Sequence, residues 1–468
     1  MVKGIGDEYE GRGMSEWSPS RRGILRALGT AAVAGTVPSV AASQNGSGAT
    51  ESWTEFAADP ANTGFAPTNT GPVASREEQW RFETEEDVLS SPAVVAHGSV
   101  DGQDGPGGAT VYVGSNDGTV YAIAADDGTE RWGFPTGGKV SSSPAVVDGT
   151  VYVGSNDNRV YAIAADDGSE RWRFETGGEV LSSPTVAGGA VYVGSNDNRV
   201  YAIAADDGSE VWRHSTNGGV WSSPAVVDGT VYVGSNDDSV YALSAADGSE
   251  EWTTPTAADV ESAPTVATID GENEPTVFVG SLDGFVYALS GADGSERWRY
   301  RAEDQVDASP AVADGTVYAG SLDGYVHALS ADDGDLEWRT ETNGVVNSAA
   351  AVTGTPDDDP SAPGTLYVGS VDGRLYALST DDGDERWHFD TDGRVYSSPA
   401  VAGGAVYVGS QDGNVYAITG GTEPTTTGDG GGGGLVPTPG FGVLGTLAAL
   451  GIGGWGLLRR NGSEGVDE

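Results

Sequence analysis

The sequence predicts an all-β protein, an eight-bladed β-propeller made of four-stranded antiparallel blades. Three observations lead to this fold class. A VYVGS-like motif recurs with a spacing of about 40 residues, each repeat holds four strand-like stretches separated by turn signals, and no repeat shows the 3.6-residue periodicity of a helix. Four short strands per repeat are typical of blades arranged around an axis, so a helical solenoid is excluded.

Each repeat contains, in order, an SSPAV stretch, a VYVGS stretch, a VYA stretch and an ERWRF stretch. The turns between them carry NDG, DDG or GG, which are residues that favour tight turns. Residues 151–170 and 191–210 are identical, which indicates a recent duplication. The eight VYVGS-like motifs begin at Val111, Val151, Val191, Val231, Val277, Val317, Leu366 and Val406.

The phase of the repeat predicts how the ring closes. Eight SSPAV-like stretches are followed by only seven outer-strand tryptophans, and the missing tryptophan precedes the first repeat. We therefore expect a strand over Glu77–Thr84 to complete the last blade and to leave no open sheet edge. The eight tryptophans are Trp80, Trp132, Trp172, Trp212, Trp252, Trp298, Trp338 and Trp387.

The outer strand and the turn before it carry a family signature. Ala122, Gly128 and Trp132 in YAIAADDGTERW resemble the tryptophan-docking motif, AxxxxxGxxxW, of pyrroloquinoline-quinone-type (PQQ-type) propellers, and the motif recurs seven times. Glycine allows a tight turn before the outer strand, and the indole can pack between blades beside the small alanine. The resemblance extends to the outer-membrane-assembly propeller lipoproteins, which implies a protein that organises partners without chemistry.

The composition excludes several classes of binding partner and of chemistry. The chain has 23 basic and 70 acidic side chains and a formal net charge of −47, so nucleic acid and anionic membrane surfaces would repel it. Such an acidic balance suits a salt-rich medium, where charges are screened, and it agrees with a haloarchaeal type of protein. There is no cysteine, which excludes disulfides and thiol chemistry.

The two ends of the chain are interpreted as export and anchoring signals. Residues 20–26, SRRGILR, resemble a twin-arginine export signal, and PGF at residues 439–441 resembles a C-terminal sorting signal. The 18 residues 441–458 carry no charge and could just span a bilayer. The predicted segments are a signal peptide (1–42), an N-terminal lead-in (43–76), the propeller (77–420), a Thr/Gly-rich stalk (421–438), a membrane anchor or sorting signal (439–460) and an acidic tail (461–468).

A candidate site comes from comparing the repeats with one another. The residue just before the Ser-Ser-Pro element varies while its surroundings stay nearly constant, and we expect it to line one mouth of the central channel. Three oxygen-bearing side chains on consecutive blades could hold calcium, and the neighbouring tryptophan could stack on a planar ligand. The alternative is a set of solvated side chains in an acidic protein. The eight positions are Leu89, Ser141, Leu181, Trp221, Glu261, Asp307, Asn347 and Tyr396, with Glu261, Asp307 and Asn347 as the calcium ligands.

Other sources of chemistry have little support in the sequence. The family resemblance to quinoprotein dehydrogenases would imply a quinone clamped by a vicinal cysteine pair, which this chain lacks. The four histidines have no ligand spacing, and turn aspartates such as Asp117 and Asp127 are explained by ordinary turn chemistry. Three insertions, 97–108, 268–275 and 354–363, fall at the same phase and should project from one face.

The sequence thus predicts an exported, cell-surface-anchored propeller that acts as a non-catalytic binding or scaffolding module. We expect a monomeric ring with protein or glycan partners at the cell surface, membrane attachment through the C-terminal anchor, no catalytic residue and no cofactor. Two alternatives stay open: a calcium- and PQQ-dependent dehydrogenase of sugars or alcohols, and a surface receptor for glycans or peptides.

Overall fold

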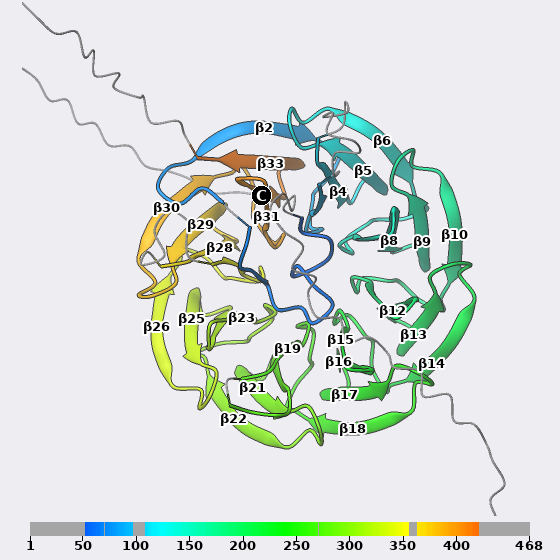
Figure 1. The fold of residues 1–468 in the computed structure, drawn as a ribbon, viewed down its shortest axis with the longest axis vertical. Coiled ribbons are helices and arrows are strands. Elements are labelled where there is room, and N and C mark those ends of the chain that lie inside the picture. Colours follow the sequence, from blue (N-terminus) through cyan, green and yellow to red (C-terminus); the bar gives the residue numbers. More distant parts are fainter. Residues whose placement is uncertain (1–51, 70, 97–107, 270, 355–362, 421–468) are drawn as a thin grey trace, which may run out of the picture.

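The computed structural model describes residues 52–69, 71–96, 108–269, 271–354 and 363–420. These residues form eight antiparallel blades around a central axis, as Figure 1 shows. Blades one to eight are numbered from the blade that begins with β3. The prediction of an all-β, eight-bladed propeller is confirmed. The predicted signal peptide, stalk, anchor and tail lie outside the described residues. Within those residues, no helix has the length and apolarity to cross a membrane.

Every blade begins with a short innermost strand beside the axis. These strands cover three residues each, less than the five of the SSPAV stretch, because the proline has no N–H for a ladder and the two serines bond through their side chains. They are β3 (Ala93–Val95), β7 (Ala145–Val147), β11 (Thr185–Ala187), β15 (Ala225–Val227), β19 (Thr265–Ala267), β23 (Ala311–Ala313), β27 (Ala351–Thr353) and β31 (Ala400–Ala402).

The second and third strands of each blade form its buried centre, and the VYVG residues are buried on both faces because blades pack on each side. The second strands are β4 (Thr110–Gly114), β8 (Thr150–Ser155), β12 (Ala190–Ser195), β16 (Thr230–Ser235), β20 (Thr276–Gly280), β24 (Thr316–Gly320), β28 (Thr365–Ser370) and β32 (Ala405–Gly409). The third strands are β5 (Thr119–Ala124), β9 (Arg159–Ala164), β13 (Arg199–Ala204), β17 (Ser239–Ser244), β21 (Phe285–Ser290), β25 (Tyr325–Ser330), β29 (Arg374–Ser379) and β33 (Asn414–Thr419).

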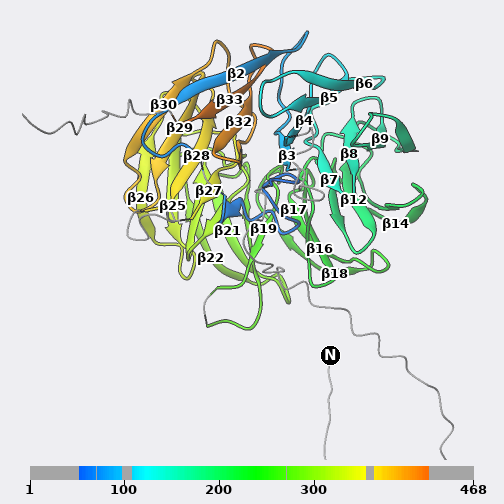
Figure 2. The ribbon, with the colours of Figure 1, turned by 45° about the horizontal axis from the view of Figure 1, so that its top comes forward.

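The outer strands alternate between exposed charged residues and inward residues, with the tryptophan turned inward. They are β6 (Glu130–Pro135), β10 (Glu170–Glu175), β14 (Glu210–Ser215), β18 (Glu250–Pro255), β22 (Glu296–Arg301), β26 (Leu336–Glu341), β30 (Glu385–Asp390) and β2 (Glu77–Glu83). The N-terminal β2 pairs antiparallel with β33 and completes blade eight, as Figures 1 and 2 show. The predicted closure of the ring is therefore confirmed.

The tryptophans join each blade to the next. The indole N–H of Trp132 donates to the Ala165 carbonyl at 3.0 Å, and its ring lies against Gly168 of blade two. A Cβ on Gly168, whose φ is +72°, would lie 2.8 Å from the indole, so glycine is required there for both its conformation and the close approach. Trp387 faces blade eight, where no turn joins β33 to the N-terminal outer strand β2, and its N–H donates to the Pro72 carbonyl of the N-terminal segment at 2.8 Å.

The two serines of the SSP element have separate roles. The first accepts a hydrogen bond from the glycine N–H of the second strand of its own blade, as Ser142 does from Gly154 at 3.0 Å. The second accepts one from its counterpart in the preceding blade, as Ser143 Oγ does from the Ser91 N–H at 2.9 Å. Repeated around the axis, this second contact forms a belt of hydrogen bonds that we call the serine ring.

The N-terminal segment 52–69 follows the inner wall of the ring and is called the strap. Within its own blade each innermost strand has only one strand neighbour, so its other edge turns polar backbone groups toward the channel. The strap accepts hydrogen bonds of 2.6–3.4 Å from the N–H groups of seven such strands, and in blade eight the Asn69 Nδ2 donates to the Val401 carbonyl at 2.6 Å. The seven donors are Val94, Val146, Val186, Val226, Val266, Val312 and Val352.

One strap contact uses a side chain in place of the backbone. At blade three the Glu55 carboxylate accepts the Val186 N–H at 3.4 Å. Glu55 is only 4% exposed, and burial raises the pKa of its carboxyl to about 8. The sequence did not predict the strap, which also forms β1 (Phe65–Ala66), parallel to β27.

Candidate functional site

The variable residues before the SSP elements surround one end of the channel. Each one stands directly before the SSP element, or before its alanine-substituted form in blades five to seven. Because this element leads into the innermost strand of every blade, the eight side chains share one end of the axis. We call this set the mouth ring. Seven members are half-buried, and Trp221 is 38% exposed. The mouth ring is made of Leu89, Ser141, Leu181, Trp221, Glu261, Asp307, Asn347 and Tyr396.

In the first half of the ring, asparagines support the mouth residues. The turn after the second strand carries an asparagine in blades one to four, and in blades one, three and four its side chain is hydrogen-bonded to the mouth residue of the next blade. The Trp221 indole N–H donates to Asn196 Oδ1 at 2.8 Å, and the Ser141 hydroxyl donates to Asn116 Oδ1 at 3.1 Å. These hydrogen bonds restrict the orientation of the Trp221 and Ser141 side chains.

In the second half, two of the three predicted calcium ligands, Asp307 and Asn347, are in direct contact. Asn347 Nδ2 donates to Asp307 Oδ2 at 2.6 Å, across the boundary between blades six and seven. Glu261 on blade five accepts a 3.4 Å hydrogen bond from Asn236 Nδ2. The amide oxygens of Asn236 and Asn347 are buried and have no hydrogen-bond partner. Two carboxylates and two such amide oxygens therefore stand on four consecutive blades.

The electrostatics of this sector follow from its burial. Burial, the charge of Asp307 and the charge of Asp259 raise the pKa of Glu261 to about 7, while the hydrogen bond from Asn236 works against the rise. Burial also raises the pKa of Asp307 above its ordinary value, although the hydrogen bond from Asn347 opposes it. Burial is the largest cause of both pKa shifts, and a bound cation would favour the charged form of both carboxyls.

The same three blades depart from the repeat at the neighbouring positions. Leu282, Leu322 and Val371 replace the turn asparagines of blades one to four. Each of these blades also replaces one residue of its serine pair by alanine, at Ala263, Ala308 and Ala349. Ala263 and Ala349 interrupt the serine ring, because they offer no hydroxyl acceptor to the N–H groups of Ser223 and Ser309. Ala308 lacks the hydroxyl that would accept the Gly320 N–H within its own blade. We call the mouth residues of blades five to seven, with these neighbours, the divergent sector.

The sector can chemically hold a hard cation through oxygen atoms, and its ligand set would be Glu261, Asp307, Asn347 and the amide of Asn236. Within the described residues, no group of three or more Asp, Glu or His side chains is arranged as a ready metal site. The role of these side chains in binding therefore stays a prediction. The sequence analysis did not predict that turn asparagines would bond to mouth residues. The signal was present, because an asparagine recurs in the SND turn of each of the first four blades.

The turn aspartates have structural partners. In seven blades the aspartate accepts the tyrosine hydroxyl of the third strand, as Asp117 Oδ2 does from Tyr121 at 2.9 Å. In blade six, His327 replaces the tyrosine, with Nε2 3.1 Å from Asp323 Oδ2 and Nδ1 3.2 Å from the Tyr300 hydroxyl. Burial opposes the change, but the hydrogen bond with His327 lowers the pKa of Asp323 overall.

The fold and the tryptophan docking define the class of protein, an eight-bladed propeller built from PQQ-type repeats. The family model described as "Outer membrane protein assembly factor BamB" matches in overlapping stretches over most of the chain, and the chain belongs to this family. The matched residues are 72–182, 116–222, 196–270, 269–359 and 324–423. A search of curated protein sequences gives no significant match.

Solved structures share the fold at low identity. BamB from Moraxella catarrhalis is 18% identical with a TM-score of 0.58, over 74% of this chain and 99% of that one. A europium-containing methanol dehydrogenase is 13% identical with a TM-score of 0.66, over 79% and 98%. A quinohemoprotein alcohol dehydrogenase from Comamonas testosteroni is 17% identical with a TM-score of 0.64, over 80% and 81%. An outer membrane protein assembly factor and dehydrogenases are thus both built on this fold.

Proposed function

We propose that this protein is an exported propeller, anchored at the cell surface, that binds or organises partners through the divergent sector without catalysis of its own. The observation that carries the proposal is the placement of the departures from the repeat. The turn asparagines, the serine pairs and the mouth residues change together on blades five to seven, although the blades keep the same strands and tryptophan docking. Side chains relieved of a packing role are free to serve recognition.

The charge of the protein and one exposed aromatic residue limit the kinds of partner that it can bind. The full chain has a net charge of −47, so the protein favours partners that present neutral or basic surface and disfavours nucleic acid. The twin-arginine-like and PGF-like segments support a location outside the cell. We propose that the protein is a monomeric ring there and binds a protein or a glycan. The exposed Trp221 beside the sector offers an aromatic face for a sugar ring or a peptide side chain.

Two experiments test the proposal. Protease added to intact cells should digest the propeller if it faces outward, and leave it whole if it stays inside. The purified protein should then capture a surface protein or glycan in high salt. The triple variant Glu261→Ser, Asp307→Leu, Asn347→Leu should lose that capture, while Leu89→Ser, Ser141→Leu, Leu181→Ser on blades one to three keeps it. Equal capture by both variants would refute the assignment of the sector.

The second candidate is the calcium- and quinone-dependent dehydrogenase, and the contact between Asp307 and Asn347 beside Glu261 favours its calcium. The ligands fit a divalent cation, because carboxylate and amide oxygens are its preferred donors. They do not fit the quinone, which is itself a polycarboxylate and would face Glu261 and Asp307 with no basic residue in the mouth ring. We therefore derive no step through a quinone.

Calcium binding can be measured directly by equilibrium dialysis of the purified protein followed by elemental analysis. One ion per chain, lost in Glu261→Gln with Asp307→Asn and kept in the matched pair Asp87→Asn with Glu179→Gln, would establish the site. A metal-free protein would remove this candidate. A saturable absorption band on adding PQQ would contradict the conclusion that the mouth ring does not fit the quinone.

A further inference from the structure

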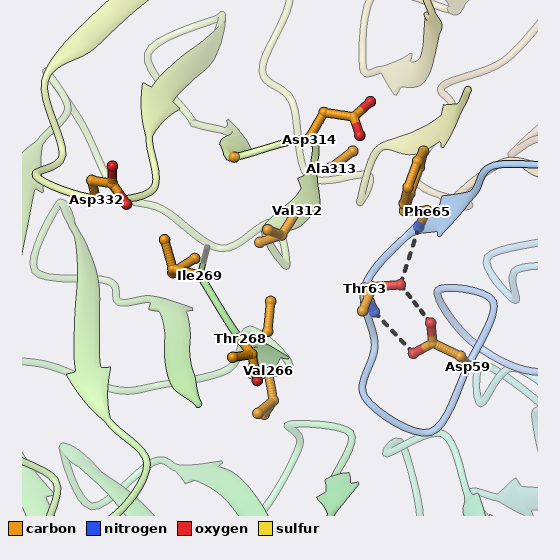
Figure 3. Close-up of a pocket in the computed structure, with 12 residues that line it drawn as sticks. Asp59, Thr63, Phe65, Val266, Thr268, Ile269, Val312, Ala313, Asp314 and Asp332 are labelled. Atoms are coloured by element: carbon orange, nitrogen blue, oxygen red, sulfur yellow. Dashed lines mark hydrogen bonds between the residues drawn. The ribbon is translucent and has the colours of Figure 1, made fainter. Parts of the chain in front are cut away.

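A cavity of about 810 Å³ lies at the other end of the ring, between blades five and six. The innermost strands run from the mouth ring toward this end, where the strap passes the ends of β19 and the β23–β24 hairpin. Figure 3 shows the strap residues Asp59, Thr63 and Phe65 on one side of the cavity and blades five and six on the other. The cavity is therefore separate from the divergent sector.

The lining combines an apolar floor with an acidic rim. Val266, Ile269 and Val312 supply apolar surface, and the half-buried Phe65 adds an aromatic wall. Asp314 and Asp332 are exposed and stand on turns of blade six. Among the described residues that line the cavity there is no lysine, arginine or histidine, so no cation in this part of the lining offsets the rim carboxylates.

Asp59, the third acid, has a different role. It accepts hydrogen bonds from the Ala61 N–H at 2.9 Å and from the N–H and hydroxyl of Thr63. Burial raises the pKa of its carboxyl, and the hydrogen bonds from Thr63 and Ala61 oppose the rise. These bonds fix the turn of the strap, and this turn sets the position of Phe65. The wall of the cavity is thereby held in place by the strap itself.

We propose that this cavity binds a small organic ammonium ion with an apolar body. The apolar body would pack on the floor, where each buried methylene contributes about 0.8 kcal/mol. The ammonium group would lie beside the Asp314 carboxylate and the face of Phe65, which attracts cations through its ring quadrupole, and Asp332 adds negative charge on the far side of the cavity. The cavity volume falls in the range of small-molecule sites, roughly 300–1,000 Å³. This inference does not rest on the function proposed above.

Phenethylammonium is a suitable probe, and calorimetry with the full-length protein is the measurement. We expect saturable binding that is about tenfold tighter than that of the neutral 2-phenylethanol, whose shape is similar. The anionic 3-phenylpropionate should not bind. Added salt should weaken the preference for the cation because charges on the rim are screened. Equal affinity for the cation and the alcohol, or no saturable binding, would overturn the proposal.

Variants connect the binding to this cavity. Asp314→Asn with Asp332→Asn should abolish the preference for the cation, and asparagine tolerates the φ of +49° at position 314. The matched control is Asp148→Asn with Asp166→Asn, the same turns in blade two, which should bind like the unchanged protein. Thr268→Trp at the exposed rim should block the probe without touching the core. Binding that survives both the acid pair and Thr268→Trp would place the probe elsewhere and refute the site.

Discussion

Blades one to four and blades five to seven are built on the same strands, yet their ends at the channel mouth differ. In the first group turn asparagines bond to the mouth residues Ser141 and Trp221, and the serine ring runs from Ser91 to Ser223 without a gap. In the second group leucine or valine takes the place of asparagine, and two alanines interrupt the ring. Because all blades share the same strands, the turn asparagines and the complete serine ring are not needed for a blade to fold. Their loss on blades five to seven is consistent with a separate role for the divergent sector.

Removing the N-terminal segment should affect both groups together and give the largest effect. A chain that begins at Val88 lacks the strap, β2 and Trp80, and so loses the edge contacts along the channel and the closure of blade eight. We expect cooperative thermal unfolding to disappear in a calorimetric scan. A shortened chain that still melts sharply at the original temperature would show that the ring closes without this segment.

Tryptophan docking should matter in both groups, but by different amounts. Trp172 in blade two is 8% exposed and bonds to Ala205 at 2.8 Å, whereas Trp338 in blade six is only half-buried. Trp172→Ala should cost about 3–5 kcal/mol in the free energy of unfolding, as large core truncations do. Trp338→Ala should cost less, because part of its ring already faces water. Denaturant unfolding measures both, and equal losses would contradict the assigned burial.

The charge of the divergent sector should show in the pH dependence of stability. The pKa of Glu261 rises in the folded state from 4.5 to about 7, so the folded protein holds this proton more tightly than the unfolded chain. The resulting stability is fully present below about pH 4.5 and is lost as the pH rises through 7. Glu261→Gln should flatten this part of the profile.

Denaturant midpoints measured between pH 4 and 8 test this expectation for Glu261. Glu179→Gln, which removes an exposed carboxylate on blade three, should leave the profile unchanged. Parallel profiles for the unchanged protein and Glu261→Gln would show that the carboxyl is not buried as described.

The smallest effect concerns the gaps in the serine ring. Ala263→Ser offers an acceptor to the Ser223 N–H and should stabilise the ring by about 1 kcal/mol, the usual net value of one hydrogen bond. Ser143→Ala breaks an existing bond and should destabilise it by a similar amount. Thermal melts measure both. A loss of stability in Ala263→Ser would mean that alanine serves packing there rather than the sector.

The sequence was sufficient for the fold because each local signal repeats seven or eight times. The tryptophan motif, its phase and Trp80 before the first blade predicted the blades, their order and the closing strand. The mouth residues were also predicted, because near-identical repeats make a variable position stand out. The contact between Asp307 and Asn347 depends on neighbouring blades and required the structure to be seen.

The strap could not be predicted in the same way. Its residues occur once, have no periodicity and bond mostly through the backbone, which leaves no mark on side-chain choice. Glu55 is an example, since a lone glutamate in a lead-in gives no sign of a buried carboxyl inside the channel. The cavity beside Phe65 was missed for the same reason, although the insertion after Ala267 falls at its edge.

Site-specific photo-crosslinking in intact cells tests most directly whether the divergent sector contacts a partner. A crosslinking residue at Val345, two positions before Asn347, can be compared with one at Glu179, the equivalent position in blade three. Both backbones accept the equivalent hydrogen bond, from Val371 and Asn196 respectively. We predict a discrete crosslinked species from position 345 and none from position 179. The same species from both positions, or none from 345, would contradict the account.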